Sequence, residues 1–424
     1  MIRIFTLIEM TLLICVLFMA DMLLLVPIDL ISLAAQNFIV GCVGLVLAIY
    51  LLPKVLRSEE IICEMRMAGK CLCLVGLVYF VSIIMTWLNY GYSIKSVLIV
   101  LAPCLLLSFV IPFVYVFHCK GNCIVTQRWI YIVAIVMLLV KMITWYLYNF
   151  KGMMIFPQLI LPYKDWVRDG MQRLDLSCFF IMVFSWTVVQ VLFEDWKKKI
   201  VYVIILSFLF FYAYSVAAIR YTTISMIIVL VVASYLKISV INEKRNKLIK
   251  MFIFFAIIIG SMLIIIASGM FEQIIGSFSI SNKDNGISTL ARLLTFVHYY
   301  HIMINEEAIF GLGLLDNSNP KALLYLYKTP TLSYYLEDLG ALGGAVRFGV
   351  MSIFLYGGIF YYLFRVSLKE KNRNVKMYIY FLCLSIFTLF TQATTNIFEG
   401  RQFFLLALIV AMFSYSECKE IRKI

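Results

Sequence analysis

Residues 272–344 read EQIIGSFSISNKDNGISTLARLLTFVHYYHIMINEEAIFGLGLLDNSNPKALLYLYKTPTLSYYLEDLGALGG, the one long interruption in a sequence otherwise made of apolar segments. The stretch holds His298, His301, Arg292, a Gly311-x-Gly313 turn and several carboxylates. Loops carry function, whereas rigid segments position it. We therefore expect the functional residues to gather in this loop.

The segments around this loop have the composition of membrane spans. Of the 424 residues, 63% are hydrophobic and only 14% are charged, which is far from the balance of soluble proteins. A span takes about 20 apolar residues. About twelve stretches meet this length, near residues 4–26, 30–52, 70–89, 97–117, 129–150, 176–194, 200–218, 221–241, 250–271, 342–364, 376–396 and 402–417.

These features predict an all-α polytopic membrane protein with about 12 transmembrane helices. We expect residues 1–424 to form a single integral membrane domain, and residues 272–344 to form an extracytoplasmic functional loop that itself contains helices.

The net charge of +13 is explained by topology. Most of the 36 basic residues fall in alternate loops, on one face of a twelve-span arrangement, as the positive-inside rule predicts for cytoplasmic loops. Both termini are then cytoplasmic and the 272–344 loop lies outside. The placement of the charge argues against nucleic acid as a partner.

Cysteine usage agrees with this topology. None of the 11 cysteines lies in the long outward loops 151–175 and 272–344, so a disulfide framework is not expected. The cluster His118-Cys119-x-x-x-Cys123 offers three metal ligands in a basic loop. We interpret its cysteines as reduced thiols and expect neither a metal nor a cofactor.

Two ionisable residues stand inside apolar segments in the outer half of the predicted membrane region. They are Asp21 in the first span and Lys141 in the fifth. An ionisable group in the membrane interior costs roughly 2.5–3.5 kcal/mol on insertion scales. We expect them to form a structural ion pair, with a proton relay as the alternative.

The second outward loop, residues 151–175, interleaves cations with aromatic residues. Arg168 and Arg173 lie near Phe156, Tyr163 and Trp166. Aromatic rings can stack on the C–H faces of a sugar while charged groups bind its hydroxyls. An aromatic belt with cations reaching toward the membrane interface is an equally good interpretation.

Arg220 stands alone between two apolar runs, followed by Thr222, Thr223 and Ser225. No room is left for a loop, so we expect its guanidinium at the outer mouth of the helix bundle. A helix begins there, and its amino-terminal N–H groups and dipole add to the positive potential. We interpret this point as a phosphate site.

Residues 288–301 predict an amphipathic helix in the large loop. Leu290, Leu293, Leu294 and Val297 recur at helical spacing. Arg292 falls on another face of this helix and could point into a cavity.

Three further polar residues are expected near the same outer face: Asp338 at the start of the tenth span, Arg347 within it, and Arg401 before the twelfth. Arg220, Arg292, Arg347 and Arg401 would then converge in one vestibule. Such a group of cations suits a pyrophosphate, at roughly 1.5–3 kcal/mol per charge-assisted contact.

The sequence resembles the Wzy-type polymerases of surface polysaccharides and the related O-antigen ligases. The resembling stretches are AIRYTTISMIIVLVV (218–232), ISTLARLLTFVHYYHIMINEEAIFGLGL (287–314) and YLEDLGALGGAVRFGVMSIFLYG (335–357). The resemblance covers an arginine at the start of a span, an arginine on a loop helix, a Gly-x-Gly turn and a glycine-rich span. Where many relatives have a His-Asn pair, this chain has Ser333-Tyr334 and Asp338.

The resemblance implies a metal-independent membrane glycosyltransferase with a GT-C-like fold in the bacterial cytoplasmic membrane. It would polymerise undecaprenyl-diphosphate-linked oligosaccharide repeat units at the outer face. Arg220 and Arg292 would hold the diphosphate, and Asp338 or His301 would act as the base. Arg347, Arg401, His298 and Arg168 would bind substrate. Membrane lipid, a chain-length regulator and a flippase would be its partners.

Two other functions remain open. A ligase of the same superfamily would use a different acceptor. A lipid-linked oligosaccharide flippase would be a transporter, a class that often shows internal repeats and charges along a central cavity. The sequence shows no convincing repeat of its two halves, which favours an enzyme.

Overall fold

The computed structural model describes residues 2–25, 33–163, 166–168, 170–241, 285–315, 319, 321–322, 327–329, 332–333, 336–393 and 396–418. It divides into two compact units. The first unit comprises Met1–Met137, Leu294–Val366 and Gln392–Ile424, and the second comprises Leu138–Leu293 and Ser367–Thr391. The prediction of one integral domain over residues 1–424 stays a prediction.

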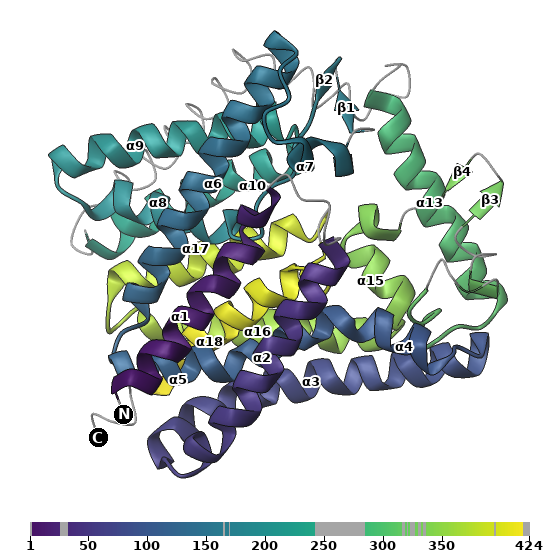
Figure 1. Cartoon of the computed structure of the whole chain (residues 1–424), viewed down its shortest axis with the longest axis horizontal. Helices are drawn as coiled ribbons and strands as arrows, with labels where there is room; N and C mark the ends of the chain where they lie inside the picture. Colours follow the sequence, from purple (N-terminus) through teal and green to yellow (C-terminus); the bar gives the residue numbers. More distant parts are fainter. Residues whose placement is uncertain are drawn as a thin grey trace. The chain divides into compact units, whose positions relative to one another are not determined.

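Figure 1 shows the described helices and strands, coloured along the chain. They are α1 (Ile2–Met19), η1 (Met22–Leu25), α2 (Leu33–Leu56), α3 (Glu59–Tyr90), α4 (Ile94–Leu101), η2 (Ala102–Phe109), α5 (Val110–Lys120), α6 (Cys123–Lys151), α7 (Pro157–Ile160), η3 (Leu161–Tyr163), β1 (Val167–Arg168), β2 (Met171–Gln172), α8 (Phe180–Phe193), α9 (Trp196–Phe211), η4 (Tyr212–Val216), α10 (Arg220–Ile241), α13 (Asn285–Asn305), β3 (Tyr327–Thr329), β4 (Leu332–Ser333), η5 (Leu336–Leu339), α15 (Ala341–Phe348), α16 (Met351–Glu370), α17 (Val375–Thr391) and α18 (Gln402–Cys418).

The all-α membrane class is confirmed. Within the described residues, seven helical segments are long and apolar enough to cross a membrane, and four shorter apolar helices accompany them. The two antiparallel pairs, β1–β2 and β3–β4, are short hairpins. The predicted span at 250–271 lies outside the described residues, and the count of about twelve spans stays a prediction.

Helix α3 shows how local signals set the helix ends. Ser58 caps its amino terminus by accepting a hydrogen bond from the Ile61 N–H, and Glu59 and Glu60 favour the positive end of the helix dipole. Gly91 ends the helix with φ 61°, and its N–H donates to the Trp87 carbonyl.

The predicted span at 342–364 is two helices, not one. Helix α15 ends at Gly349, whose φ is 56°, and α16 begins at Met351. The Val350 N–H donates to the Ile309 carbonyl at 2.9 Å, outside any helix. A backbone with positive φ cannot continue a right-handed helix, so the chain turns here.

Each unit is built around a helix that is apolar on every side. In the first unit, α18 is buried over nearly its whole length and packs on α3, α5 and η2. In the second, α17 is buried between α8 and α10. A helix that is hydrophobic all round belongs in the interior, whereas the exposed apolar faces of helices such as α2 and α9 suit lipid.

Candidate functional site: a cavity lined by arginine and aromatic side chains

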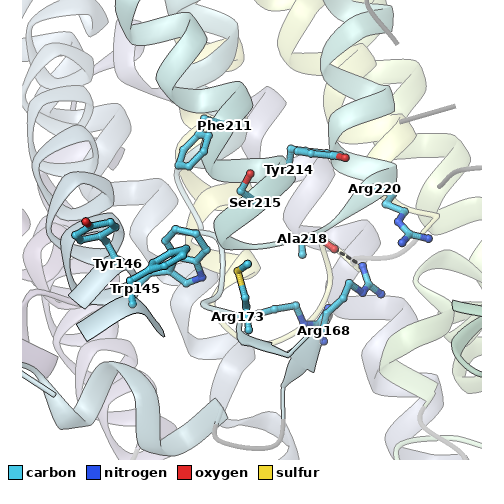
Figure 2. Close-up of a pocket in the computed structure, with 11 residues that line it drawn as sticks. Trp145, Tyr146, Arg168, Arg173, Phe211, Tyr214, Ser215, Ala218 and Arg220 are labelled. Carbon is cyan, nitrogen blue, oxygen red and sulfur yellow. Dashed lines mark hydrogen bonds between the residues drawn. The ribbon is translucent and has the colours of Figure 1, made fainter. Parts of the chain in front are cut away.

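A cavity of about 440 Å³ in the second unit collects three arginines (Figure 2). Arg168 comes from β1, Arg173 from the residue after β2, and Arg220 from the first turn of α10. Its volume lies within the range usual for small-molecule sites, about 300–1,000 Å³. The cavity is therefore large enough to take a small ligand or part of a larger one.

Aromatic side chains form much of the remaining lining. They are Trp145, Tyr146, Phe150, Phe211 and Tyr214. The Trp145 ring meets the rings of Phe150 and Phe211 edge-on, with centroids 5.7 and 6.2 Å apart. Such contacts hold the tryptophan in place. The cavity thus combines guanidinium groups with ring faces.

A π-helical turn shapes one side of the cavity. In η4 the Ala217 N–H donates to the Tyr212 carbonyl at 2.9 Å, a bond spanning five residues. Ala218 follows with φ 51°, which a residue other than glycine adopts only at a cost of about 1–3 kcal/mol. Widened turns and strained residues of this kind recur at functional sites.

Arg168 is held directly by that strained turn. Its Nη1 donates a hydrogen bond to the Ala218 carbonyl, drawn as the dashed line in Figure 2. The same turn is fixed to the hairpin by the Leu174 N–H, which donates to the Val216 carbonyl at 3.1 Å. The hairpin and the start of α10 are thereby tied together, and Arg168 and Arg220 enter one cavity.

The hairpin is anchored on α6 by a reciprocal pair of hydrogen bonds. The Asn149 Nδ2 donates to the Gln172 carbonyl at 3.2 Å, and the Gln172 N–H donates to Asn149 Oδ1 at 2.8 Å. Arg173 follows, and its guanidinium carbon lies 5.6 Å from the centre of the Trp166 ring. This cation–π contact orients the positively charged guanidinium of Arg173.

An ion pair joins α6 to the segment that follows β2. Lys141 is only 1% exposed, and its Nζ donates to Asp175 Oδ1 at 2.6 Å. The Tyr212 hydroxyl donates to the Asp175 carbonyl at 3.0 Å. Asp175 thus joins α6 to the π-helical turn that lines the cavity.

The electrostatics of the cavity favour an anion. Arg220 lies at the amino terminus of α10, where helix N–H groups and the dipole add to its charge. Among the described residues that line the cavity, none is acidic. Across the described part of the chain, no group of three or more His, Cys, Asp or Glu could hold a metal ion.

The sequence identified two of the three cavity arginines as site residues. Arg168 and Arg220 were predicted as such, whereas Arg173 was noted only as part of the aromatic loop. The signal that could have identified Arg173 is its spacing in the hairpin: it is five residues from Arg168, across the Gly170 turn with φ 74°. Antiparallel pairing returns the chain to the same edge.

Arg347 lies in the first unit and is held by a carboxylate. It forms an ion pair with Glu399, which also accepts a hydrogen bond from Asn396 Nδ2 at 3.3 Å. Tyr356 donates to Asn396 Oδ1 at 2.8 Å and completes this network. The arrangement gives Arg347 a structural role in the turn before α18.

Arg401 is held in the same turn by an acidic residue from the other end of the chain. It pairs with Asp21, which is buried, and its Nε donates to Asn37 Oδ1 at 3.3 Å. Burial lowers the pKa of the Arg401 guanidinium to about 10, so the group stays charged at neutral pH. Substrate binding by Arg347 and Arg401 stays a prediction.

The predicted pairing of Asp21 with Lys141 is wrong. Each residue has a different partner, Arg401 for Asp21 and Asp175 for Lys141. Arg220 belongs to the second unit, whereas Arg347 and Arg401 belong to the first. A vestibule shared by all of the predicted arginines therefore stays a prediction.

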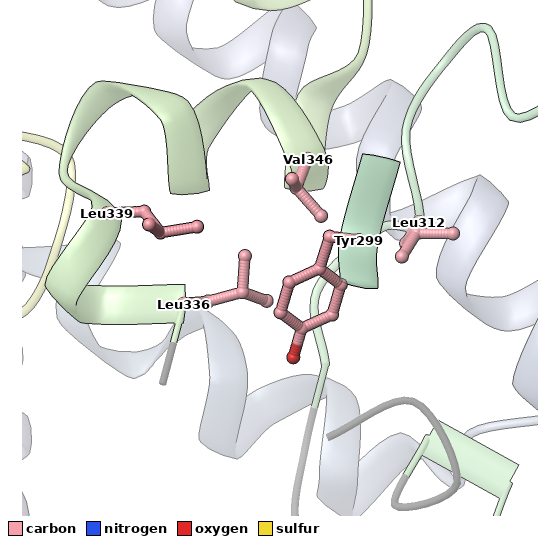
Figure 3. Packing of buried hydrophobic residues seen from close by; sticks show 5 residues of the cluster. All are labelled: Tyr299, Leu312, Leu336, Leu339 and Val346. Atoms are coloured by element: carbon pink, nitrogen blue, oxygen red, sulfur yellow. The ribbon is translucent and has the colours of Figure 1, made fainter. Parts of the chain in front are cut away.

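Helix α13 packs inward with a face other than that of its leucines. Tyr299 is fully buried among Leu312, Leu336, Leu339 and Val346 (Figure 3). Leu293, Leu294 and Val297 are instead 40–57% exposed. In a membrane protein the apolar face can turn to lipid while the mixed face packs inward, which explains why these leucines and Val297 are exposed.

The remaining predicted residues lie on or near α13. Arg292 shares the face of Thr295 and Tyr299 by its spacing of three and seven residues, and its Nε is buried without a hydrogen-bond partner in the described structure. His298 is half-buried and His301 is exposed. Asp338 lies in η5, directly before α15. Their catalytic and binding roles stay predictions.

The Gly311-x-Gly313 turn packs its backbone closely against the backbone of Val346 and Arg347. The Leu312 N–H donates to the Val346 carbonyl at 2.8 Å and the Gly313 N–H to the Arg347 carbonyl at 3.0 Å. Both glycines have φ near 80°. A Cβ on Gly311 would lie 2.5 Å from the Arg347 carbonyl oxygen, so only glycine fits.

The described residues form a helical multi-pass membrane protein with a cavity lined by arginine and aromatic side chains. No protein-family model matches the chain, and no curated protein is similar to it.

Proposed function

We propose that this protein is a GT-C-like membrane glycosyltransferase that polymerises undecaprenyl-diphosphate-linked oligosaccharide repeat units. The observation that carries the proposal is the arginine-lined cavity at the amino terminus of α10, with aromatic walls beside it. Guanidinium groups suit phosphate oxygens, and ring faces suit sugars. The resemblance of residues 218–232, 287–314 and 335–357 to Wzy-type polymerases supports the same reaction class.

The proposed reaction exchanges one C–O bond for another. The bond between the anomeric carbon of the growing glycan and the diphosphate oxygen breaks, and that carbon forms a bond with a hydroxyl oxygen of the acceptor repeat unit. The diphosphate leaves with the electron pair of the broken bond. Because negative charge grows on it, Arg220 and Arg168 would stabilise the transition state more than the ground state.

The hydroxyl proton needs an acceptor. We propose His301 on α13 or Asp338 in η5 for this role. Arg292 would assist at the diphosphate, as the resemblance implies. Arg173, held over the Trp166 ring, would add a further contact to the anion or to sugar hydroxyls.

In the proposed setting the protein lies in the bacterial cytoplasmic membrane with both termini cytoplasmic and the cavity open toward the outer face. A flippase would deliver the lipid-linked repeat units, and a chain-length regulator would act beside the polymerase. The basic residues of alternate loops support this orientation.

The test uses the purified full chain in lipid vesicles with an undecaprenyl-diphosphate-linked repeat unit, with the products resolved on a gel. A ladder of polymers is expected from the wild type and from Lys198→Gln, a control that removes an exposed charge outside the cavity. The ladder should disappear in Arg220→Gln. Polymers of normal length from Arg220→Gln would refute the assignment.

The products of this reaction also distinguish a polymerase from a ligase and from a flippase. A ligase would transfer the glycan once to a different acceptor and form no ladder. A flippase would move the lipid between leaflets without a new glycosidic bond.

A further inference from the structure

Two thiols from opposite ends of the first unit lie in direct contact. Cys63 Sγ and Cys418 Sγ are 2.7 Å apart, although 355 positions separate them in sequence. Cys63 lies in the first turns of α3, and Cys418 is the last residue of α18. We propose that this pair is a disulfide-forming site that can staple the carboxyl end of α18 to the amino end of α3.

The contact is the end point of a long helix pairing. Farther along α3, and near the amino end of α18, the rings of Tyr79 and Phe403 meet edge-on with centroids 5.6 Å apart. The two contact points are 16 residues apart on α3 and 15 apart on α18, so the helices run antiparallel in register over about 24 Å. The thiols are therefore brought together by the packing of two whole helices.

A side-chain hydrogen bond near Cys418 also fixes the rotation of α18 about its axis. Ser414 lies one turn before Cys418, and its Oγ is 2.8 Å from the Tyr362 hydroxyl of α16. Residues four apart share a helix face. The hydrogen bond to Tyr362 limits rotation of α18 near Cys418, and because the two sulfurs already lie 2.7 Å apart, no rearrangement of helices is needed to join them.

The surroundings set how the bond would form. Cys63 is half-buried, whereas Cys418 is buried. Buried Glu64 and Glu417 adjoin the two cysteines in sequence. The more accessible thiol meets the oxidant first, so the first attack should occur at Cys63. The second step is intramolecular and fast.

The chemistry needs a small-molecule disulfide as oxidant. The Cys63 thiolate attacks it, forms a mixed disulfide and releases one small thiolate. The Cys418 thiolate then attacks the Cys63 sulfur, forms the protein disulfide and releases the second small thiolate. The two cysteines lose two electrons and two protons, and the oxidant gains both.

The test uses the purified full chain, dipyridyl disulfide as oxidant, and maleimide labelling followed by peptide mass analysis. We expect a Cys63–Cys418 linked peptide as the main crosslink and loss of maleimide labelling at both cysteines, whereas exposed Cys73 and Cys119 should be recovered as mixed disulfides with the reagent and not as crosslinks. Cys63→Ser and Cys418→Ser should each abolish the crosslink. Oxidised wild type that still labels at both cysteines, or that links Cys63 to another cysteine equally well, overturns the proposal.

A second measurement follows the effect on the fold. A crosslink over so long a loop restricts the unfolded chain, so oxidation should raise the Tm of the wild type by a few degrees and leave that of Cys63→Ser unchanged. An equal shift in both proteins overturns the proposal. Neither measurement depends on the proposed glycosyl transfer, so each can fail while the other stands.

Discussion

The two units use arginine in opposite ways. In the first unit, Arg347 and Arg401 are bound to Glu399 and Asp21, both largely buried. In the second unit, the arginines line a cavity with aromatic walls. The same residue type, at similar breaks between apolar segments, forms buried ion pairs in one place and lines a cavity in the other. What differs is the neighbour that each guanidinium meets.

The largest expected effect is on the ion pairs of the first unit. Arg401→Met leaves the Asp21 carboxylate buried without its cation, and should lower the free energy of unfolding by about 3–5 kcal/mol. Thermal unfolding in detergent measures the loss. The double variant Asp21→Asn with Arg401→Met, which removes both charges and keeps a residue that tolerates the φ of 68° at position 21, should recover part of it. If Arg401→Met is as stable as the wild type, the pair is not structural.

The next effect is on the cavity of the second unit. Arg220→Gln should lower the rate of polymerisation by about 100- to 1,000-fold because charge on the leaving diphosphate loses its stabilisation. The Tm should stay close to that of the wild type, since the side chain is half-exposed at a helix start. A drop in Tm that accounts for the lost activity would place Arg220 with the structural arginines.

A smaller effect is expected at the Gly311 turn, which packs against the chain around Arg347. Gly311→Ala should cost about 1–3 kcal/mol of stability, because its φ is 81° and a Cβ would strike the backbone. Gly357→Ala is the matched control. It lies within α16 with open space around it, and should be neutral or slightly stabilising. Equal stability of the two variants would contradict the packing role.

The smallest effect is expected from removing one of the aromatic side chains that line the cavity. Tyr146 is 49% exposed, so Tyr146→Ala should fold normally. Loss of a stacking ring should weaken saccharide binding by about 0.5–1.5 kcal/mol. Titration of a soluble repeat-unit oligosaccharide against the tryptophan fluorescence checks this. Tyr361→Ala, which removes an exposed ring outside the cavity, should leave the affinity unchanged.

The sequence was informative where the signal is local. Apolar segments located most of the described membrane helices to within several residues, since burying a backbone in lipid requires a helix. The exceptions are α3, which begins 11 residues before the predicted 70–89 span, and the 342–364 span, which is two helices. Arg220 was placed at a helix start, and α10 begins at that residue.

The sequence did not decide orientation where both faces of a helix are largely apolar. The leucines of residues 288–301 predicted an amphipathic helix but not which face packs inward; Tyr299 packs inward, while Leu293 is exposed. In water an apolar face must be buried, but in a bilayer lipid satisfies it as well as protein does. Periodicity alone therefore does not tell inside from outside.

By itself, the sequence determined the membrane class, the helical fold and the positions of most described helices. These follow from the length of apolar runs and from capping residues, which act over a few positions. Only the tertiary structure decided that Asp21 meets Arg401, that Lys141 meets Asp175, and that Arg173 joins Arg168 and Arg220. The reason is physical: a charge in the membrane interior must find a partner, and which partner it finds depends on how distant helices pack.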